Sequence, residues 1–240
     1  MEILITLCAR GGSKGIPGKN IRLIDGLPLI AYSIAHANSF SAIHKADIAL
    51  STDSFDIKEV AKNYGLKTKY IRPDDVSLDG TGKMETILHV LSFEESTRQK
   101  KYDYILDLDI SSPLRNLDDL LIGFEKILND PNALNLFSVN PANRNPYFNM
   151  VEQKADGYYG LVKEGNFLTR QSAPAIFDLN ASFYFYRRSF FSADHRTVFT
   201  DSSLIYTMPH ICFDLDHIID FDFLEYLLAN QKLDFQIWKS

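Results

Sequence analysis

Residues 3–20 read ILITLCARGGSKGIPGKN, an apolar run followed at once by a loop of glycines and cations. The run at 3–7 predicts a buried first strand, and PLIAYSIAHA from residue 28 has the spacing of a helix. Glycines let the backbone turn its N–H groups inward at the carboxyl end of a strand, where open α/β sheets bind ligands. Three cations stand among these glycines: Arg10, Lys14 and Lys19. The loop is therefore shaped to bind a polyphosphate.

This loop differs from two widespread phosphate-binding motifs. The P-loop pattern G-x-x-x-x-G-K-[ST] would need glycine where Ser13 stands and Ser or Thr where Asn20 stands. The loop does not match the dinucleotide pattern G-x-G-x-x-G either. A glycine-rich surface turn with solvated charges is the alternative interpretation. Three cations placed directly after an apolar strand favour the phosphate site.

Composition bounds the class of protein. With 240 residues and 45% hydrophobic content, the chain can bury a substantial core in one large α/β domain or a domain with an appendage. The formal net charge of −6 argues against a nucleic-acid-binding surface. Cys8 and Cys212 are too few for a disulfide scaffold and are expected to be buried thiols. The sequence shows no signal-like or membrane-spanning apolar stretch, so a cytoplasmic location without a membrane partner is expected.

Strand and helix patterns alternate through the first 140 residues, which predicts a mostly parallel sheet with helices on both faces. The expected strands are 3–8, 46–51, 67–71, 102–109 and 134–139. The expected helices are 28–39, 55–64, 81–96 and 117–129. After residue 178 the strand and helix patterns of the main domain return. They are the apolar run ASFYFYRR, residues 205–216 and a helix pattern from 217 to 230. The whole chain is predicted to form a single domain, 1–240.

The segment from about 140 to 178 breaks this alternation. It holds two short aromatic-rich strand candidates, 147–151 and 157–162, separated by the turn-forming KADG. We expect an arm inserted into the main domain, and an ordinary surface hairpin is the alternative.

The D-x-D pairs that end the segments 102–109 and 205–216 are Asp107 with Asp109 and Asp214 with Asp216. In an extended strand, residues two apart point to the same face, so each pair presents two carboxylates side by side. Such oxygen-rich sites suit Mg²⁺, which completes its shell with water and substrate phosphate. Asp216 is also a candidate N-cap for the helix that follows. The six histidines form no ligand-spaced cluster.

Polar residues also follow two other predicted strands. Asp53 could contact a nucleotide or cap the helix that starts near Phe55. In the segment 111–116, SSPLRN, proline ends the strand and leaves Ser hydroxyls and Arg115 near the carboxyl edge. Arg115 could contact a ligand, brace the site, form a surface ion pair or act as a helix-cap partner.

The run ARGGSKGIPGKN at 9–20 resembles the N-terminal signature of the acylneuraminate cytidylyltransferases, which join CMP from CTP to a nine-carbon 2-keto sugar acid. Five further segments resemble that family in the same order, from residue 3 to about 230. They are Ser51-Thr52-Asp53, Arg72-Pro73, Ser112-Pro113-Leu114-Arg115, Arg170-Gln171 and Asp214-Leu215-Asp216. The resemblance implies a Rossmann-like nucleotidyltransferase sheet, and a homodimer in which the arm at about 140–178 is a dimerisation element.

The resemblance also implies roles for individual residues. Arg10, Lys14 and Lys19 would be catalytic and hold the triphosphate, while Asp214 and Asp216 would bind Mg²⁺. Nucleotide-binding positions would be Ala9, Gly11, Gly12, Ser13, Asn20, Ser51, Asp53 and Arg72. Substrate-binding positions would be Asp109, Ser112, Arg115, Arg170, Gln171 and Asn180. No side chain is an obvious general base.

Two departures from the family pattern concern the sugar pocket. Asp109 stands where neuraminate enzymes more often have Gln, and the D-L-N-A run at 178–181 replaces a common R-P-N-G. These changes make a different nine-carbon acid plausible, such as the diamino sugar legionaminic acid. The alternatives are an enzyme for the eight-carbon acid KDO, another sugar nucleotidyltransferase, or a non-catalytic nucleotide-binding homologue.

Overall fold

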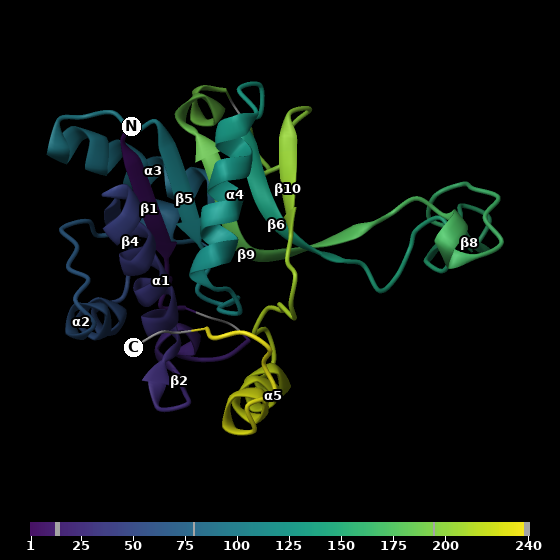
Figure 1. The fold of residues 1–240 in the computed structure, drawn as a ribbon, viewed down its shortest axis with the longest axis horizontal. Coiled ribbons are helices and arrows are strands. Elements are labelled where there is room, and N and C mark those ends of the chain that lie inside the picture. The colour runs from purple at the N-terminus through teal and green to yellow at the C-terminus, as the bar shows by residue number, and fades with distance from the viewer. Residues whose placement is uncertain (13–14, 79, 194, 238–240) are drawn as a thin grey trace.

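A six-stranded sheet forms the centre of the protein (Figure 1). The computed structural model describes residues 1–12, 15–78, 80–193 and 195–237. The strand order is β10-β6-β9-β5-β1-β4. The strands are β1 (Ile3–Cys8), β4 (Asp47–Ser51), β5 (Tyr104–Leu108), β6 (Asn135–Pro141), β9 (Phe177–Arg187) and β10 (Ser203–Thr207). β9 is antiparallel to both of its neighbours, β5 and β6, whereas the other pairs are parallel. The prediction of a mostly parallel α/β sheet is confirmed.

Five helices connect and cover the strands. They are α1 (Leu29–His44), α2 (Phe55–Asn63), α3 (Lys83–Arg98), α4 (Leu117–Asn129) and α5 (Ile218–Ala229). Single-turn 3₁₀ helices lie at Lys19–Ile21, Asp74–Val76, Arg170–Ser172 and Arg188–Ser192. A small β2–β3 hairpin (Leu23–Ile24 and Leu27–Pro28) leads into α1. None of the described helices is long and apolar enough to cross a bilayer.

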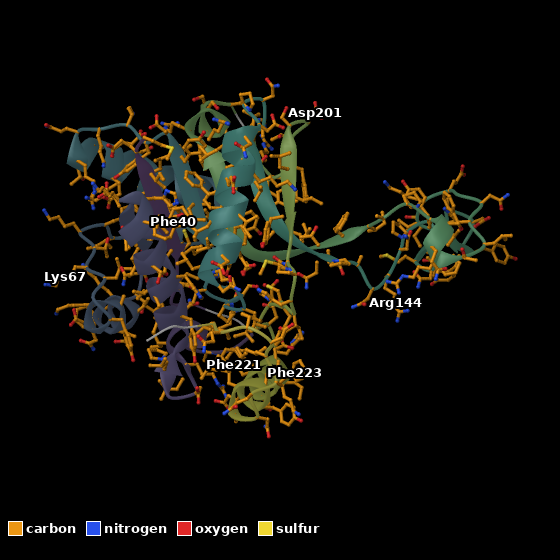
Figure 2. All side chains as sticks on the ribbon, viewed as in Figure 1. Phe40, Lys67, Arg144, Asp201, Phe221 and Phe223 are labelled. Atoms are coloured by element: carbon orange, nitrogen blue, oxygen red, sulfur yellow. The ribbon has the colours of Figure 1, made fainter. Side chains whose placement is uncertain are left out.

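The two faces of the sheet are covered by different helices. Alternate residues of β9 point to opposite faces, so Phe185 packs in one cluster with α1, α2, α4 and α5, while Tyr186 packs in the other with α3. Phe40 of α1 contacts Phe124 of α4 edge to face and lies inside the packed body in Figure 2. Helices therefore lie on both faces, as expected of a doubly covered α/β sheet.

The arm grows out of the sheet as an extension of the β6–β9 ladder. Pro141 pairs with Phe177 at its base, and the chain between them projects away from the body, with Arg144 on the neck (Figure 2). The antiparallel pair β7 (Val151–Gln153) and β8 (Tyr159–Leu161) lies at the far end (Figure 1). The segment between Pro141 and Phe177 is therefore an excursion between two neighbouring strands of the main sheet.

Three predicted elements differ from the structure. Residues 67–71 do not join the sheet; the segment runs beside edge strand β4, and a bond from the Thr68 hydroxyl to the Leu50 carbonyl replaces a ladder. Residues 147–150 form turns around the Asn145 carbonyl instead of a strand, so β7 begins only at Val151. α1 continues past residue 39 to His44, because nothing in NSFSAIH ends a helix.

Candidate active site

The glycine-rich loop follows β1 directly and is tied to the carboxyl end of β4. The Ala9 N–H donates to the Ser51 carbonyl at 2.9 Å, and the Gly11 N–H donates to Asp53 Oδ1 at 2.7 Å. A Cβ at Gly11 would lie 2.9 Å from the Ser54 Cβ, so a larger residue would push the loop away from α2. The loop and the end of β4 thus form one unit, as their common place at the carboxyl edge predicts.

Nearby residues hold this unit in shape. Asn20 donates from its side-chain amide to the Arg10 carbonyl at 3.0 Å, which closes the loop on itself. Arg72 is 6% exposed and donates to the hydroxyl and the carbonyl of Ser51 at 2.9 and 2.8 Å. These two predicted nucleotide-binding side chains therefore brace the loop and strand end in this conformation. Ser13 and Lys14, predicted for the same site, lie outside the described residues, and Gly12 has open space beside it.

The acidic segment Asp214-Leu215-Asp216 is anchored to the end of β5 and to the loop through its central residue. Leu215 is buried, its N–H donates to the Ser111 carbonyl at 2.8 Å, and its carbonyl accepts from Lys19 Nζ at 3.0 Å. Lys19 Nζ also lies 3.1 Å from Asp216 Oδ1. The structure therefore joins the cationic loop to the acidic pair, which lies 197 residues further along the chain.

Asp214 has an unusual environment for a carboxylate. Its Oδ1 is buried and has no hydrogen-bond partner among the described residues. Burial raises the pKa of Asp214 to about 7, and the negative charges of Asp109 and Asp216 add to the effect. A divalent cation would supply the missing partner for this oxygen and oppose the repulsion between the carboxylates.

The carboxylates available here fit Mg²⁺ better than a metal ion whose ligands are all protein side chains. Within the described part of the chain, no three His, Cys, Asp or Glu side chains gather as a ready metal cage. Mg²⁺ needs only one or two carboxylates, because water and substrate phosphates complete its shell. Asp214 and Asp216 can supply those two ligands.

The other D-x-D pair lies on β5 and contains a residue that sequence reasoning missed. Lys83 Nζ lies 2.9 Å from Asp107 Oδ2 and 3.0 Å from Asp109 Oδ2. Asp107 is 1% exposed and also accepts from the Thr6 hydroxyl at 2.7 Å. Asp107 is thus a structural carboxylate. Lys83 stands in no recognised motif, and a lone lysine gave no signal in the sequence.

Arg115 braces the site and has no surface to offer a substrate in this conformation. It is 0% exposed, and one guanidinium nitrogen donates to the carbonyls of Asp109, Ser112 and Ser182. The expectations of a surface ion pair and of a direct substrate contact are therefore wrong for this conformation, because every direction around the fork faces protein.

Ser112 and Asn180, predicted to contact substrate, belong to the same buried polar network. The Ser112 hydroxyl donates to the Asn180 carbonyl at 2.8 Å, and the Asn180 side chain bonds Ser138 and Asn140. Asn140 in turn donates to the Cys212 carbonyl, two residues before Asp214. This network joins the base of the arm to the acidic segment.

Arg170 and Gln171 lie in the arm, exposed and away from the glycine-rich loop. Arg170 donates to the Ala142 carbonyl at 2.6 Å, next to the point where the arm leaves β6. A single chain does not bring these two residues together with the loop and the acidic segment.

Neither of the two acidic residues considered as helix N-caps, Asp53 and Asp216, caps its helix. Ser54, and not Asp53, caps α2 by accepting from the Ile57 N–H. α5 is capped by His217 with Asp220, whose carboxylate accepts the N–H groups of Asp216 and His217. Asp53 and Asp216 instead carry the loop contacts described above.

The two cysteines are free thiols. Burial raises the pKa of Cys8 to about 12 and that of Cys212 to about 11. Neither thiol ionises near neutral pH; Cys212 is buried as expected, whereas Cys8 is only partly buried.

Comparison with known proteins finds one matching family model and several similar proteins. A family model described as Cytidylyltransferase matches residues 4–234. The chain is 40% identical over 233 residues to the CMP-N,N'-diacetyllegionaminic acid synthase of Campylobacter jejuni, with 97% of each chain covered. It is 39% identical to Post-translational flagellin modification protein B of Campylobacter coli, again over 97% of each chain. It is 30% identical to the pseudaminic acid cytidylyltransferase of C. jejuni, over 95% of this chain and 96% of that one.

A solved structure shares the fold at low sequence identity. The CMP:2-keto-3-deoxy-manno-octonic acid synthetase complexed with CTP superposes with a TM-score of 0.70 at 14% identity, over 96% of this chain and 100% of that one.

Proposed function

Because the chain belongs to the cytidylyltransferase family, we propose that it transfers CMP from CTP to the anomeric hydroxyl of a nine-carbon 2-keto sugar acid and releases pyrophosphate. The observation that supports this proposal is the contact of Lys19 with Asp216, since the cationic loop proposed to bind phosphate lies against the acidic pair proposed to bind Mg²⁺. A transferase that acts on a nucleoside triphosphate needs both elements at one point. The named relatives with 95–97% of this chain covered support the same reaction class.

The chain's own residues would bind and orient the reactants. Arg10, Lys14 and Lys19 would neutralise the triphosphate, with the loop N–H groups as further donors. Asp214 and Asp216 would hold Mg²⁺, which when bound supplies Lewis-acid stabilisation of charge on the phosphate oxygens. The sugar hydroxyl attacks the α-phosphate, so positioning the two reactants is the main task of the protein.

For the sugar, we propose a preference for a diamino acid of the legionaminic type over N-acetylneuraminic acid. The relative at 40% identity is named for N,N'-diacetyllegionaminic acid, and Asp109 puts a charged acceptor that cannot donate where neuraminate enzymes more often have Gln. A site with a fixed acceptor discriminates against a substrate that lacks the matching donor, because the acceptor is left unpaired.

The test offers CTP, Mg²⁺ and a panel of sugar acids to the purified chain and measures CMP-sugars by mass spectrometry. The panel includes legionaminic, pseudaminic and N-acetylneuraminic acids and the eight-carbon acid KDO. We expect CMP transfer, with kcat/KM for legionaminic acid above that for N-acetylneuraminic acid. A ratio at or below one refutes the sugar preference alone. Product from KDO only would favour the KDO-type alternative, and no pyrophosphate from any acid would favour a non-catalytic nucleotide-binding protein.

A further inference from the structure

Lys83 is the first residue of α3, and its ammonium group contacts three other side chains. Its Nζ is 2.9 Å from Asp107 Oδ2, 3.0 Å from Asp109 Oδ2 and 4.1 Å from the centroid of the Tyr184 ring. Burial would lower the pKa of Lys83, but the charges of Asp107 and Asp109 outweigh it and raise the pKa well above the ordinary value. The ammonium therefore stays charged; it donates a hydrogen bond to Asp109 and lies within ion-pair distance of Asp107.

Asp109 is held on both of its oxygens. Oδ1 accepts from the N–H and the hydroxyl of Ser111 at 2.9 and 2.8 Å, and Oδ2 accepts from Lys83. An ionised carboxylate offers roughly four acceptor positions and no donor. Three are taken by the described residues, so about one position remains, on the oxygen that Lys83 orients. The side chain is 27% exposed, so that position can be reached from outside.

The charge state of Asp109 follows from the same contacts. Burial alone would raise its pKa, but the Lys83 ammonium and the Ser111 donors outweigh burial and lower the pKa to about 2. At neutral pH this position can only accept a hydrogen bond, whereas the amide of a Gln could also donate one. Ser111, whose N–H and hydroxyl bond Asp109, also accepts from the Leu215 N–H at 2.8 Å through its carbonyl, so Asp109 lies beside the acidic segment where the reaction is proposed to occur.

We propose that Lys83 is a positioning residue for sugar selection, which fixes the Asp109 carboxylate so that its one open acceptor position binds the second N-acyl N–H of a diamino sugar acid, which N-acetylneuraminic acid lacks. The inference rests on the proposed function and adds to it the pair of residues that sets the preference. Lys83 acts through Asp109, while Asp107 and Tyr184 keep the lysine in place.

A double-mutant cycle tests this role. kcat/KM is measured with N,N'-diacetyllegionaminic acid and with N-acetylneuraminic acid for the parent, Lys83→Met, Asp109→Asn and the double variant. We expect the ratio of the two values to fall about tenfold in each single variant, since a hydrogen bond to a charged group is worth roughly that much discrimination. The double variant should fall no further, because each change already removes the charged acceptor held in one orientation. Lys83→Arg should keep more of the ratio than Lys83→Met.

Two further variants guard against a trivial loss of folding. Lys83→Met leaves the buried Asp107 without its cation, so Lys83→Met combined with Asp107→Asn removes the pair as a unit and should retain the fold with the lowered ratio. Lys101→Met, which removes an exposed lysine that pairs with the buried Glu95, is the matched control and should keep the parent ratio. A parent-like ratio in folded Lys83→Met or in its Asp107→Asn combination overturns the inference while CMP transfer stands. A parent enzyme that makes no CMP-sugar overturns the proposed function and the inference with it.

Discussion

Arg10, Lys14 and Lys19 place three cations in one loop of a chain whose net charge is −6. A local cluster of this kind is needed because the protein as a whole repels a triphosphate. We predict that Arg10→Ala and Lys14→Ala each lower kcat about 100-fold, the usual effect of removing one preorganised electrostatic donor, with little change in melting temperature. Lys62→Ala, which removes an exposed ion pair with Glu59, is the control. Near-normal turnover in both loop variants would remove the triphosphate assignment.

The two acidic pairs should respond differently to the same substitution. Asp214→Asn and Asp216→Asn should raise the Mg²⁺ concentration for half-maximal activity about tenfold or more, because each removes an anionic ligand. Asp107→Asn should leave metal activation unchanged and lower thermal stability instead, since it breaks the buried pair with Lys83. A Mg²⁺ titration of activity, with melting temperatures alongside, separates the two effects. Equal stimulation of all three variants would place the metal elsewhere.

Ala181 occupies a left-handed backbone conformation, with φ of +56°, where β9 bulges away from β6. A Cβ in this region costs roughly 1–2 kcal/mol, which glycine avoids. The R-P-N-G pattern of many neuraminate enzymes has glycine here. We predict that Ala181→Gly raises stability by about 1 kcal/mol, or about 2–4 °C in melting temperature. Ala35→Gly in the helical α1 should lower it by a similar amount. Destabilisation by both changes would show that Ala181 is unstrained.

At the scale of elements, the C-terminal segment is fastened to α1 by one buried histidine. His36 is 4% exposed, and its Nε2–H donates to the Ile237 carbonyl at 2.6 Å. Burial, reinforced by the positive charge of Arg115, lowers the pKa of His36 to about 3. The unfolded chain, with a pKa near 6.5, therefore binds more protons between pH 6.5 and 3, and stability falls as the pH falls through that window.

We predict that His36→Gln, which keeps an N–H donor without the titration, flattens this acid loss. The free energy of unfolding, measured with urea at pH 7, 6 and 5, should fall about 1 kcal/mol per pH unit more steeply in the parent below pH 6. Parallel curves would show that His36 does not titrate differently in the two states.

At the scale of the whole molecule, the arm carries apolar side chains that its own chain leaves open. Tyr158, Tyr159 and Leu168 are 76%, 68% and 89% exposed. A two-stranded hairpin of this size has no second layer on which to bury them. We predict a dimer at micromolar concentration in sedimentation velocity, shifted towards monomer by Tyr158→Ser with Leu168→Ser. Phe55→Ser, equally exposed but on α2, should leave the dimer intact. A parent protein that sediments only as a monomer would contradict the prediction.

The sequence by itself determined the features that depend on neighbours along the chain. The apolar run of β1, the glycines after it, the alternation of strands with α1 to α4 and the break at the arm are short-range patterns. The structure has them, except for the strand expected at 67–71 between α2 and α3. The signature from Ala9 to Asn20 was also enough to indicate the family, because a phosphate loop is built from consecutive residues.

Only the tertiary structure decided which distant groups meet. β9 enters the sheet antiparallel between β5 and β6, and this order brings Tyr184 to Lys83 and the Ser182 carbonyl to Arg115. Burial turned Arg115 from a candidate ligand contact into a brace, and Lys83 became a site residue only when α3 set it against Asp107 and Asp109. The reason is physical: turn chemistry and periodicity act over a few residues, whereas charge pairing and burial depend on the order in which strands and helices pack.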